Sequence, residues 1–200
     1  MKERGMIFNA EMVNAILSGR KTQTRRPIKW KQTRFTEIGE REDGSNWPWS
    51  EDTEKVCDYW HPCPFGAVGD RIWVRETWAE AGASAPDLTL YRANYPEHVP
   101  AQYENVPPVD EILWTPSIFM PRWASRILLE ITDVRVEHLN NISECDAKAE
   151  GGPTECTLIG DKYFPGFRSL WKSIYGEQSW AANPWVWVIK FNLIGNEAAQ

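Results

Sequence analysis

The stretch that most constrains the fold is the longest alternating segment, residues 126–139. Polar and apolar side chains alternate along it, which predicts one long, bent strand or a pair of strands with one buried face. Residues 185–191 are almost entirely apolar and predict a second, buried strand. Weaker strand signals occur at 6–8, 71–78 and 88–92. Because each of these segments has apolar side chains to bury, we expect them to share a sheet.

Helices are predicted to be few and short. The expected helices are residues 10–17 before Gly19, residues 144–150 between Ser143 and Gly151, and residues 167–175 before Gly176. Strands joined by so few helices, without regular strand and helix alternation, indicate an α+β fold. We expect a small twisted mixed β-barrel with flanking short helices rather than a doubly wound sheet.

The chain is predicted to form one domain with two insertions. Its 200 residues, 42% of them hydrophobic, suffice for one core with long insertions. Residues 31–60 and 93–116 are rich in charge and proline and show no clear period, so both are predicted to be inserted loops. We therefore expect a single domain over residues 1–194 and a flexible tail over 195–200.

The charge of the chain excludes a uniformly basic nucleic-acid-coating protein. The formal net charge is -6, so any contact with nucleic acid must come from a local patch. No apolar run approaches the length of a membrane span, and residues 1–5 lead into folded-looking sequence without a signal-peptide core. We expect a soluble, cytoplasmic protein that has no membrane partner.

The four cysteines indicate free thiols rather than a disulfide framework, because they are few and unevenly spaced. Cys57, His61 and Cys63 are the residue types of half a zinc site, but no second pair with suitable spacing follows them. The chain also lacks a phosphate-binding glycine loop. We therefore expect neither a metal nor a cofactor.

A cationic segment, residues 18–27, contains Lys21 and Thr24 among three arginines and ends at Pro27. It follows the predicted helix 10–17, so we expect both residues on a loop that turns them toward one pocket. A threonine hydroxyl is a poor nucleophile until a base takes its proton, and a lysine with a lowered pKa can be that base. A carboxylate would complete the group by orienting the lysine or holding water. The simpler alternative is a solvated turn.

Twelve tryptophans exceed what a core of this size needs. Aromatic faces stack on nucleobases, so a surplus of them is typical of proteins that hold unpaired bases. Trp73, Trp171, Trp185 and Trp187 lie within predicted strands or helices and are expected to fill the core. Trp78 and Trp123 lie beside charged residues at the ends of apolar runs, which leaves stacking on a base open for both.

Four motifs in a fixed order resemble those of ASCH-domain proteins, and most closely those of the longer members from phages and prophages. They are Gly19-x-Lys21-x-x-Thr24-x-Arg26, Gly69-Asp70-Arg71-Ile72-Trp73-Val74, Ile142-Ser143-Glu144 leading to Ala149-Glu150, and Trp185-Val186-Trp187-Val188-Ile189. The resemblance covers nearly the whole chain outside residues 31–60 and 93–116. It implies a PUA-like fold and an association with RNA or modified nucleosides.

The resemblance also implies an activity. Small bacterial ASCH proteins are amidohydrolases that remove the acetyl group from the exocyclic amine of acetylated cytidine, using a lysine, a threonine and a glutamate. By motif these are Lys21, Thr24 and Glu150, with Glu76 as the rival carboxylate. The residues expected to bind substrate are Arg26 and Arg75, which would neutralise an oxyanion or a phosphate, and Trp78, Tyr91 and Trp123, which would stack on the base.

Two other functions remain open on the sequence. The chain could be a module that binds RNA or single-stranded nucleic acid without catalysis, or a ribonuclease, since other members of the superfamily are described in those ways. It could also act through protein contacts in phage assembly or host takeover, with 31–60 and 93–116 as the contact surfaces. In the first case the partner is RNA or a modified nucleoside. The oligomeric state is open.

Overall fold

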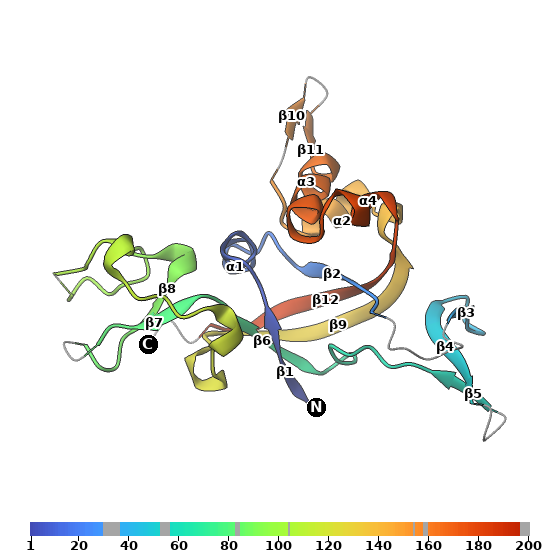
Figure 1. Cartoon of the computed structure of the whole chain (residues 1–200), viewed down its shortest axis with the longest axis horizontal. Helices are drawn as coiled ribbons and strands as arrows, with labels where there is room; N and C mark the ends of the chain where they lie inside the picture. The colour runs from blue at the N-terminus through green and yellow to red at the C-terminus, as the bar shows by residue number, and fades with distance from the viewer. Residues whose placement is uncertain are drawn as a thin grey trace.

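The computed structural model describes residues 1–29, 37–52, 57–82, 85–103, 105–153, 155–157 and 160–196. Its centre is a five-stranded sheet with the strand order β1-β6-β9-β12-β2 (Figure 1). The strands are β1 (Glu3–Ile7), β2 (Gln23–Pro27), β6 (Arg71–Arg75), β9 (Ile127–His138) and β12 (Trp185–Asn196). β1 and β6 are parallel and the other pairs are antiparallel. The α+β class is therefore confirmed.

The expected barrel is not closed in the described part of the chain. β1 and β2 are the edges of the sheet and pair with β6 and β12 only. A side chain spans the gap instead of a strand ladder: an Arg26 terminal nitrogen donates to the Ile7 carbonyl at 2.7 Å, and the guanidinium lies 5.2 Å from the Phe8 ring centre. One polar side chain, from the β2 edge, thus meets the backbone at the end of β1 where backbone pairing would complete a barrel.

The long alternating segment forms one strand, β9, as its pattern predicts. β12 pairs with it over its whole length, with register shifts at Lys190/Phe191 and Leu193/Gly195 that accommodate the bend. Because β12 continues to Asn196, the predicted tail begins later than residue 195, and residues 197–200 lie outside the described part. β6 ends at Arg75, so the observed strand is shorter than the strand predicted over residues 71–78.

The sheet is covered on both faces. α1 (Ala10–Leu17) packs Val13 and Ile16 into a core with Ile189, whereas α3 (Phe164–Tyr175) packs Phe167 and Trp171 against Val186 and Val188. Alternation along β12 explains the two cores, since neighbouring residues point to opposite faces. α2 (Glu144–Ala149) and α4 (Glu177–Ala181) gather with α3 on one side of the sheet (Figure 1).

The helix ends follow the sequence signals. The Asn9 side chain accepts from the Met12 backbone nitrogen at 2.8 Å, and Ser143 accepts from the Asp146 backbone nitrogen at 3.1 Å. Both contacts satisfy a backbone donor in the first turn of a helix. Gly19 follows α1 with a φ of 72°, the left-handed conformation that glycine adopts without strain.

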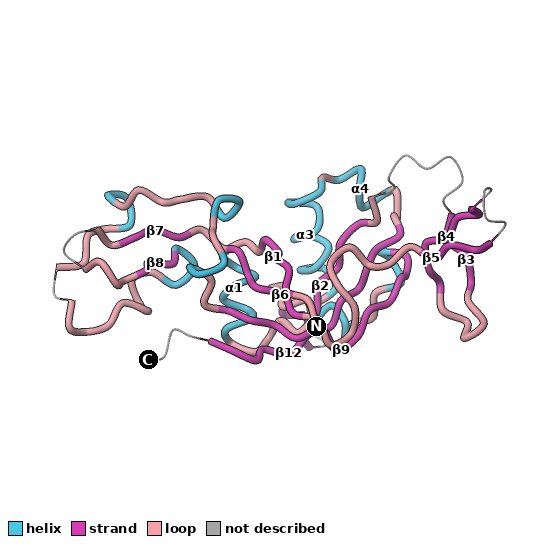
Figure 2. Tube along the Cα trace, turned by 90° about the horizontal axis from the view of Figure 1, so that it is seen from below, coloured by secondary structure: helices cyan, strands magenta, loops and turns pink. Residues whose placement is uncertain are grey.

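Residues 37–60 are not a loop, which corrects the prediction for 31–60. Their described part forms a separate antiparallel sheet of β3 (Glu37–Glu40), β4 (Asn46–Asp52) and β5 (Cys57–Trp60) (Figure 2). Trp49 pairs with Trp60 across two strands, and Trp47 meets Trp187 of the central sheet edge-on at 5.0 Å. Aromatic cross-strand pairs stabilise this sheet despite the charges that obscure its alternation. Residues 31–36 and 53–56 lie outside the described part.

The described residues from 76 to 124 form an extension on the side of the central sheet opposite β3, β4 and β5 (Figures 1 and 2). It contains the pair β7 (Trp78–Glu80) and β8 (Thr89–Tyr91), and the 3-10 turns η1 (Arg92–Asn94), η2 (Val109–Glu111), η3 (Ser117–Phe119) and η4 (Arg122–Ala124). The remaining elements are the turn η5 (Leu139–Asn141) and the hairpin of β10 (Glu155–Thr157) and β11 (Gly160–Lys162). No described helix is long and apolar enough to cross a membrane.

The start of α3 lies against the segment before β10, and Gly166 permits the close approach. A Cβ atom at Gly166 would lie 1.7 Å from the Pro153 carbonyl oxygen, so we expect Gly166→Ala to displace backbone and to lower the free energy of unfolding by about 3 kcal/mol. Gly152→Ala is the matched control, because its Cβ would meet the Phe167 nitrogen at an ordinary 3.4 Å. Urea unfolding measures both; equal stabilities would contradict the packing.

Candidate functional site

Lys21 lies where the chain turns out of α1 and meets the end of α2. The Lys21 backbone nitrogen donates to the Ala15 carbonyl at 2.9 Å. Lys21 also forms an isolated antiparallel β-bridge with Glu150. The next residue, Thr22, donates to the Ala149 carbonyl at 2.8 Å. The segment after α1 is therefore joined to the end of α2, although more than a hundred residues separate them in the chain.

Thr24 is in a strand rather than on the predicted loop. It belongs to β2 and pairs with Ile189 of β12, and only 1% of its surface is exposed. The cationic residues on either side hid this strand, because they have no apolar period to reveal it. Their long side chains are accommodated by carboxylates and by the free edge of the sheet.

The Lys21 side chain makes a buried ion pair with Glu150. Lys21 Nζ lies 2.9 Å from Glu150 Oε2 and also donates to the Glu150 backbone carbonyl at 2.8 Å. Desolvation by burial lowers the pKa of Lys21; the Glu150 charge opposes that shift, and Arg26 and Arg25 reinforce it. The amine can therefore give up its proton more readily than an exposed lysine, as a general base must.

Arg25 occupies the other oxygen of the same carboxylate. One terminal nitrogen lies 3.1 Å from Glu150 Oε1, and the second donates to Glu137 of β9 and lies 3.5 Å from Asp146 Oδ2. The Arg25 side chain is fully buried. Glu150 is thus held at both oxygens by two cations, and each cation comes from the segment between α1 and the end of β2.

A narrow cleft lies over the free edge of β2. Its polar wall contains Thr24, Arg25, Arg26 and Glu150, and its apolar wall comes from Met12 of α1 and from Phe167, Leu170, Trp171, Ile174 and Tyr175 of α3. The cleft has a volume of about 10 Å³, which is room for about one water. Its walls bring a hydroxyl residue, a carboxylate and two cations to one apolar surface, and these are residue types that a hydrolytic site uses.

Of the residues expected from the sequence, the structure brings Lys21 and Glu150 into direct contact. Thr24, Arg26 and Glu150 line the cleft. Within the described residues, no hydrogen bond joins Thr24 to Lys21. Glu150, and not Glu76, is the carboxylate that meets Lys21.

Glu76 belongs to a second buried ion pair elsewhere in the fold. Its carboxylate accepts two hydrogen bonds from Arg126, each 2.9 Å long, and burial raises the pKa of Glu76 while Arg126 opposes that shift. The Arg126 guanidinium also lies 4.0 Å from the ring centre of Tyr91 and donates to Asn94 at 2.9 Å. This pair connects the 76–124 extension to the start of β9.

The other residues expected to bind substrate lie at the end of β6 or in the 76–124 extension, and they do not line the cleft. Trp78 and Tyr91 are buried in one small core, and the Tyr91 hydroxyl donates to the Ala124 carbonyl at 3.0 Å. Arg75 donates to the Ile118 carbonyl and lies over Trp73. Trp123 is 65% exposed and meets Trp78 edge-on at 5.4 Å. Their side chains were expected to share one pocket with Lys21, but the fold distributes them over two sites.

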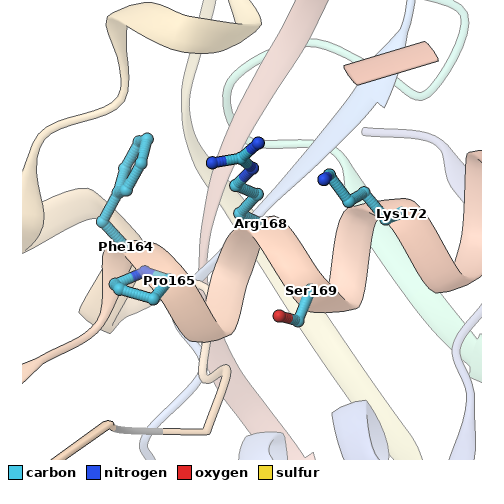
Figure 3. A pocket seen from close by; sticks show the side chains of 5 residues that line it. All are labelled: Phe164, Pro165, Arg168, Ser169 and Lys172. Atoms are coloured by element: carbon cyan, nitrogen blue, oxygen red, sulfur yellow. The ribbon is translucent and has the colours of Figure 1, made fainter. Parts of the chain in front are cut away.

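A larger hollow lies along α3, with a volume of about 320 Å³. Phe164, Pro165, Arg168, Ser169 and Lys172 line it, and all five side chains come from the one helix (Figure 3). Lys172 pairs with Glu177 at 2.5 Å, and the Arg168 guanidinium lies 5.6 Å from the Trp180 ring centre. Both cations are thereby engaged in holding α4 to α3. None of the described residues that line the hollow is a carboxylate, and its lysine is paired with Glu177, so the narrow cleft is the better candidate site.

The cysteines do not supply a metal site in the described part of the chain. No cluster of three or more His, Cys, Asp or Glu side chains is found there. Burial raises the pKa of Cys63 to about 11, which keeps this residue a thiol at neutral pH. His61 lies 2.8 Å from the Ser50 hydroxyl. The Cys57 side chain, the remaining member of the half-site, lies outside the described part.

Sequence reasoning missed two parts of the site. Arg25 was expected only as a neighbouring cation, and the apolar face of α3 was expected only as core. If Thr24 is placed in a strand, its neighbours Gln23 and Arg25 must point to the opposite face, and that alternation is the signal for the burial of Arg25. Nothing in the local sequence indicates that Glu137 and Asp146 approach it.

Comparison of the chain with protein-family models, with curated proteins and with solved structures found no match. The chemistry of the cleft is therefore the basis for assigning a function.

The lowered pKa of Lys21 has a measurable effect on stability. As the pH rises toward 10.5, the folded protein releases the Lys21 proton before the unfolded chain does, because the pKa of Lys21 is lower in the folded state. The free energy of unfolding therefore rises with pH in this window, by up to about 1.4 kcal/mol per pH unit, and Lys21→Met removes that rise. Urea unfolding of both proteins from pH 7 toward pH 10 measures the difference, with Lys148→Met as the control for loss of one lysine. If the free energies of unfolding of wild type and Lys21→Met changed in parallel with pH, the lowered pKa of Lys21 would be contradicted.

Proposed function

We propose that this chain is a PUA-like protein of the ASCH type that hydrolyses the amide on the exocyclic amine of acetylated cytidine. The observation that carries the proposal is the buried Lys21, whose amine is paired with Glu150 beside a cleft that Thr24 lines. A buried amine beside a hydroxyl residue and a carboxylate provides a base, a nucleophile and an orienting group. The order of the four sequence motifs supports the family assignment.

In the proposed reaction, the Thr24 hydroxyl attacks the acetyl carbon and Lys21 takes the hydroxyl proton. The oxyanion that forms faces Arg26, the cation of the cleft with the more exposed side chain. The carbon–nitrogen bond then breaks and Lys21 returns the proton to the departing amine, which leaves an acetyl ester on Thr24. Water hydrolyses that ester, Lys21 again moves the proton, and acetate and cytidine are released. Glu150 orients Lys21 throughout.

The cleft must widen for this substrate to enter. Its volume of about 10 Å³ holds about one water, which is less than an acetyl group requires. The wall made by α3 is apolar and includes Ile174, which is 42% exposed. An apolar wall next to a polar one suits a methyl group on one side and a carbonyl on the other.

The test is deacetylation of acetylated cytidine, followed by chromatography. We expect turnover by the wild type, a loss of kcat/KM of about a hundredfold or more for Lys21→Ala and Thr24→Val, and near wild-type rates for Lys148→Ala, which removes an exposed lysine of α2. Circular dichroism and thermal melting establish that each variant is folded. The assignment fails if the wild type releases no acetate, or if Lys21→Ala turns over at an equal rate.

One observation favours a second function, binding of single-stranded RNA without catalysis. Two aromatic side chains on the 76–124 extension face solvent, since Phe119 is 69% and Trp123 is 65% exposed, and Arg122 lies between them in the chain. Exposed rings suit stacked bases, and stacking carries this contact because Arg122 is paired with Glu3 at 3.0 Å.

This second function predicts that labelled RNA raises fluorescence polarisation at low salt and that the affinity falls steeply as salt increases. Trp123→Ala should weaken binding by about tenfold, because one stacking contact contributes about 1–3 kcal/mol. Leu113→Ala, at a 93% exposed apolar residue without a ring, is the matched control. Equal affinities of wild type and Trp123→Ala would exclude the aromatic surface as the binding site.

A further inference from the structure

Arg25 is the one fully buried cation of the site to which the proposed reaction gives no role. Its guanidinium contacts three elements: Glu150 and Asp146 of α2 and its end, Glu137 of β9, and the Phe167 ring of α3 at 5.8 Å. A buried arginine is tolerated only where carboxylates surround it. These partners fix both terminal nitrogens of the Arg25 guanidinium. A guanidinium fixed in this way can orient the carboxylates that it binds.

The carboxylate of Glu150 has one oxygen for each cation. Arg25 lies 3.1 Å from Oε1, and Lys21 Nζ lies 2.9 Å from Oε2. A carboxylate held at one oxygen can rotate about its last bond, whereas one held at both cannot. Arg25 therefore determines where Oε2 lies, and Oε2 determines where the Lys21 amine lies.

The two cations differ in what they can do with a proton. Arginine stays protonated at any ordinary pH, whereas burial lowers the pKa of Lys21. Of the two groups that share Glu150, only Lys21 can release and accept a proton. The charge of Arg25 stays in place while that of Lys21 changes.

The charged and titratable groups that face this pair come from several elements. They are Arg26 of β2, Asp146 of α2, Asp133, Arg135 and Glu137 of β9, Lys190 of β12, and Tyr175 of α3. Glu137 and Asp146 also pair with Arg135, at 3.5 Å and 3.3 Å. Arg135 thus belongs to the same network without touching Glu150, and it offers a matched comparison.

We propose that Arg25 is a positioning residue of the candidate active site: it holds Oε1 of Glu150 so that Oε2 stays on Lys21, and its permanent charge keeps the Lys21 amine free to take a proton. The inference rests on the hydrolase proposed above. A purely structural Arg25 would only tie β2 to α2 and β9. The two roles differ in pH dependence, because only the positioning role changes the protonation of Lys21.

The first measurement is the pH dependence of kcat and KM for acetylated cytidine in wild type, Arg25→Gln, Arg25→Lys and the control Arg135→Gln. Removing the Arg25 charge favours protonated Lys21. The acidic limb of the kcat–pH profile of Arg25→Gln should therefore move to higher pH by about 0.5 to 1 unit. Its kcat should fall about tenfold or more while KM changes little. Arg25→Lys keeps the positive charge but loses the planar guanidinium. The acidic limb of its kcat–pH profile should therefore stay at the wild-type position while kcat falls. Arg135→Gln should resemble the wild type.

The second measurement does not depend on turnover. The ¹³Cε resonance of Lys21, assigned with Lys21→Arg, reports its protonation in a pH titration of each folded protein. A titration midpoint that shifts to higher pH in Arg25→Gln but not in Arg135→Gln supports the proposal. A midpoint that is unchanged in Arg25→Gln overturns it. If Arg25→Gln does not fold, the kinetics of Arg25→Lys provide the test. A reduced kcat with the acidic limb of its pH profile at the wild-type position supports the positioning role, and a wild-type kcat overturns it. Absence of turnover by the wild type refutes the hydrolase alone, and the resonance titration then decides on Arg25.

Discussion

The buried pair of Lys21 and Glu150 is the interaction on which the rest of this structure depends. Glu150 is buried with two cations, Lys21 and Arg25, and removing one charged partner from such a buried cluster costs about 3–5 kcal/mol. The backbone is adapted to the contact as well. Gly151 has a φ of 72°, and a Cβ at that position would lie 2.7 Å from the Lys21 Cβ. A glycine after Glu150 is what lets the two segments come so close.

The pair also explains how distant parts of the chain share one site. Lys21 follows α1, which belongs to the core on one face of the sheet, and Glu150 ends α2, whose Ala147 belongs to the core on the other face. The pair lies at the free edge of β2, where the two cores meet without a further strand between them. A site at this place is polar on the side of the strand and apolar on the side of α3, and it needs no insertion into the sheet.

Much of the fold could be predicted from local sequence, because the signals were local. Alternation identified β9, and capping residues such as Ser143 and stops such as Gly19 and Gly176 placed the helices. Lys21 and Thr24 came from the chemistry of the cationic segment and Glu150 from motif resemblance, and the contact between Lys21 and Glu150 is a finding of the structure. The strand character of β2 was hidden by its arginines. The sheet over 37–60 was hidden by its charges, although its tryptophans pair across strands.

The pairing of charges could not be predicted in the same way. Glu76 and Glu150 are both acidic residues downstream of the cationic segment, and each has a buried arginine and a nearby aromatic ring in the fold. Which carboxylate meets Lys21 depends on whether β2 lies beside α2 or beside the 76–124 extension. That choice is made by strand order, which no short stretch of sequence encodes.

The contact between Gly166 and Pro153 has a consequence for the direction in which the cleft can open. Since the backbone of α3 touches the preceding segment at this glycine, the N-terminal end of the helix is fixed, and the Lys172–Glu177 ion pair and the Trp171–Ser179 hydrogen bond join its C-terminal half to α4. A helix held near both ends leaves side-chain rotation as the way to widen the cleft. Of the α3 residues that line the cleft, Ile174 is the one with an exposed side chain, so the widening would begin there.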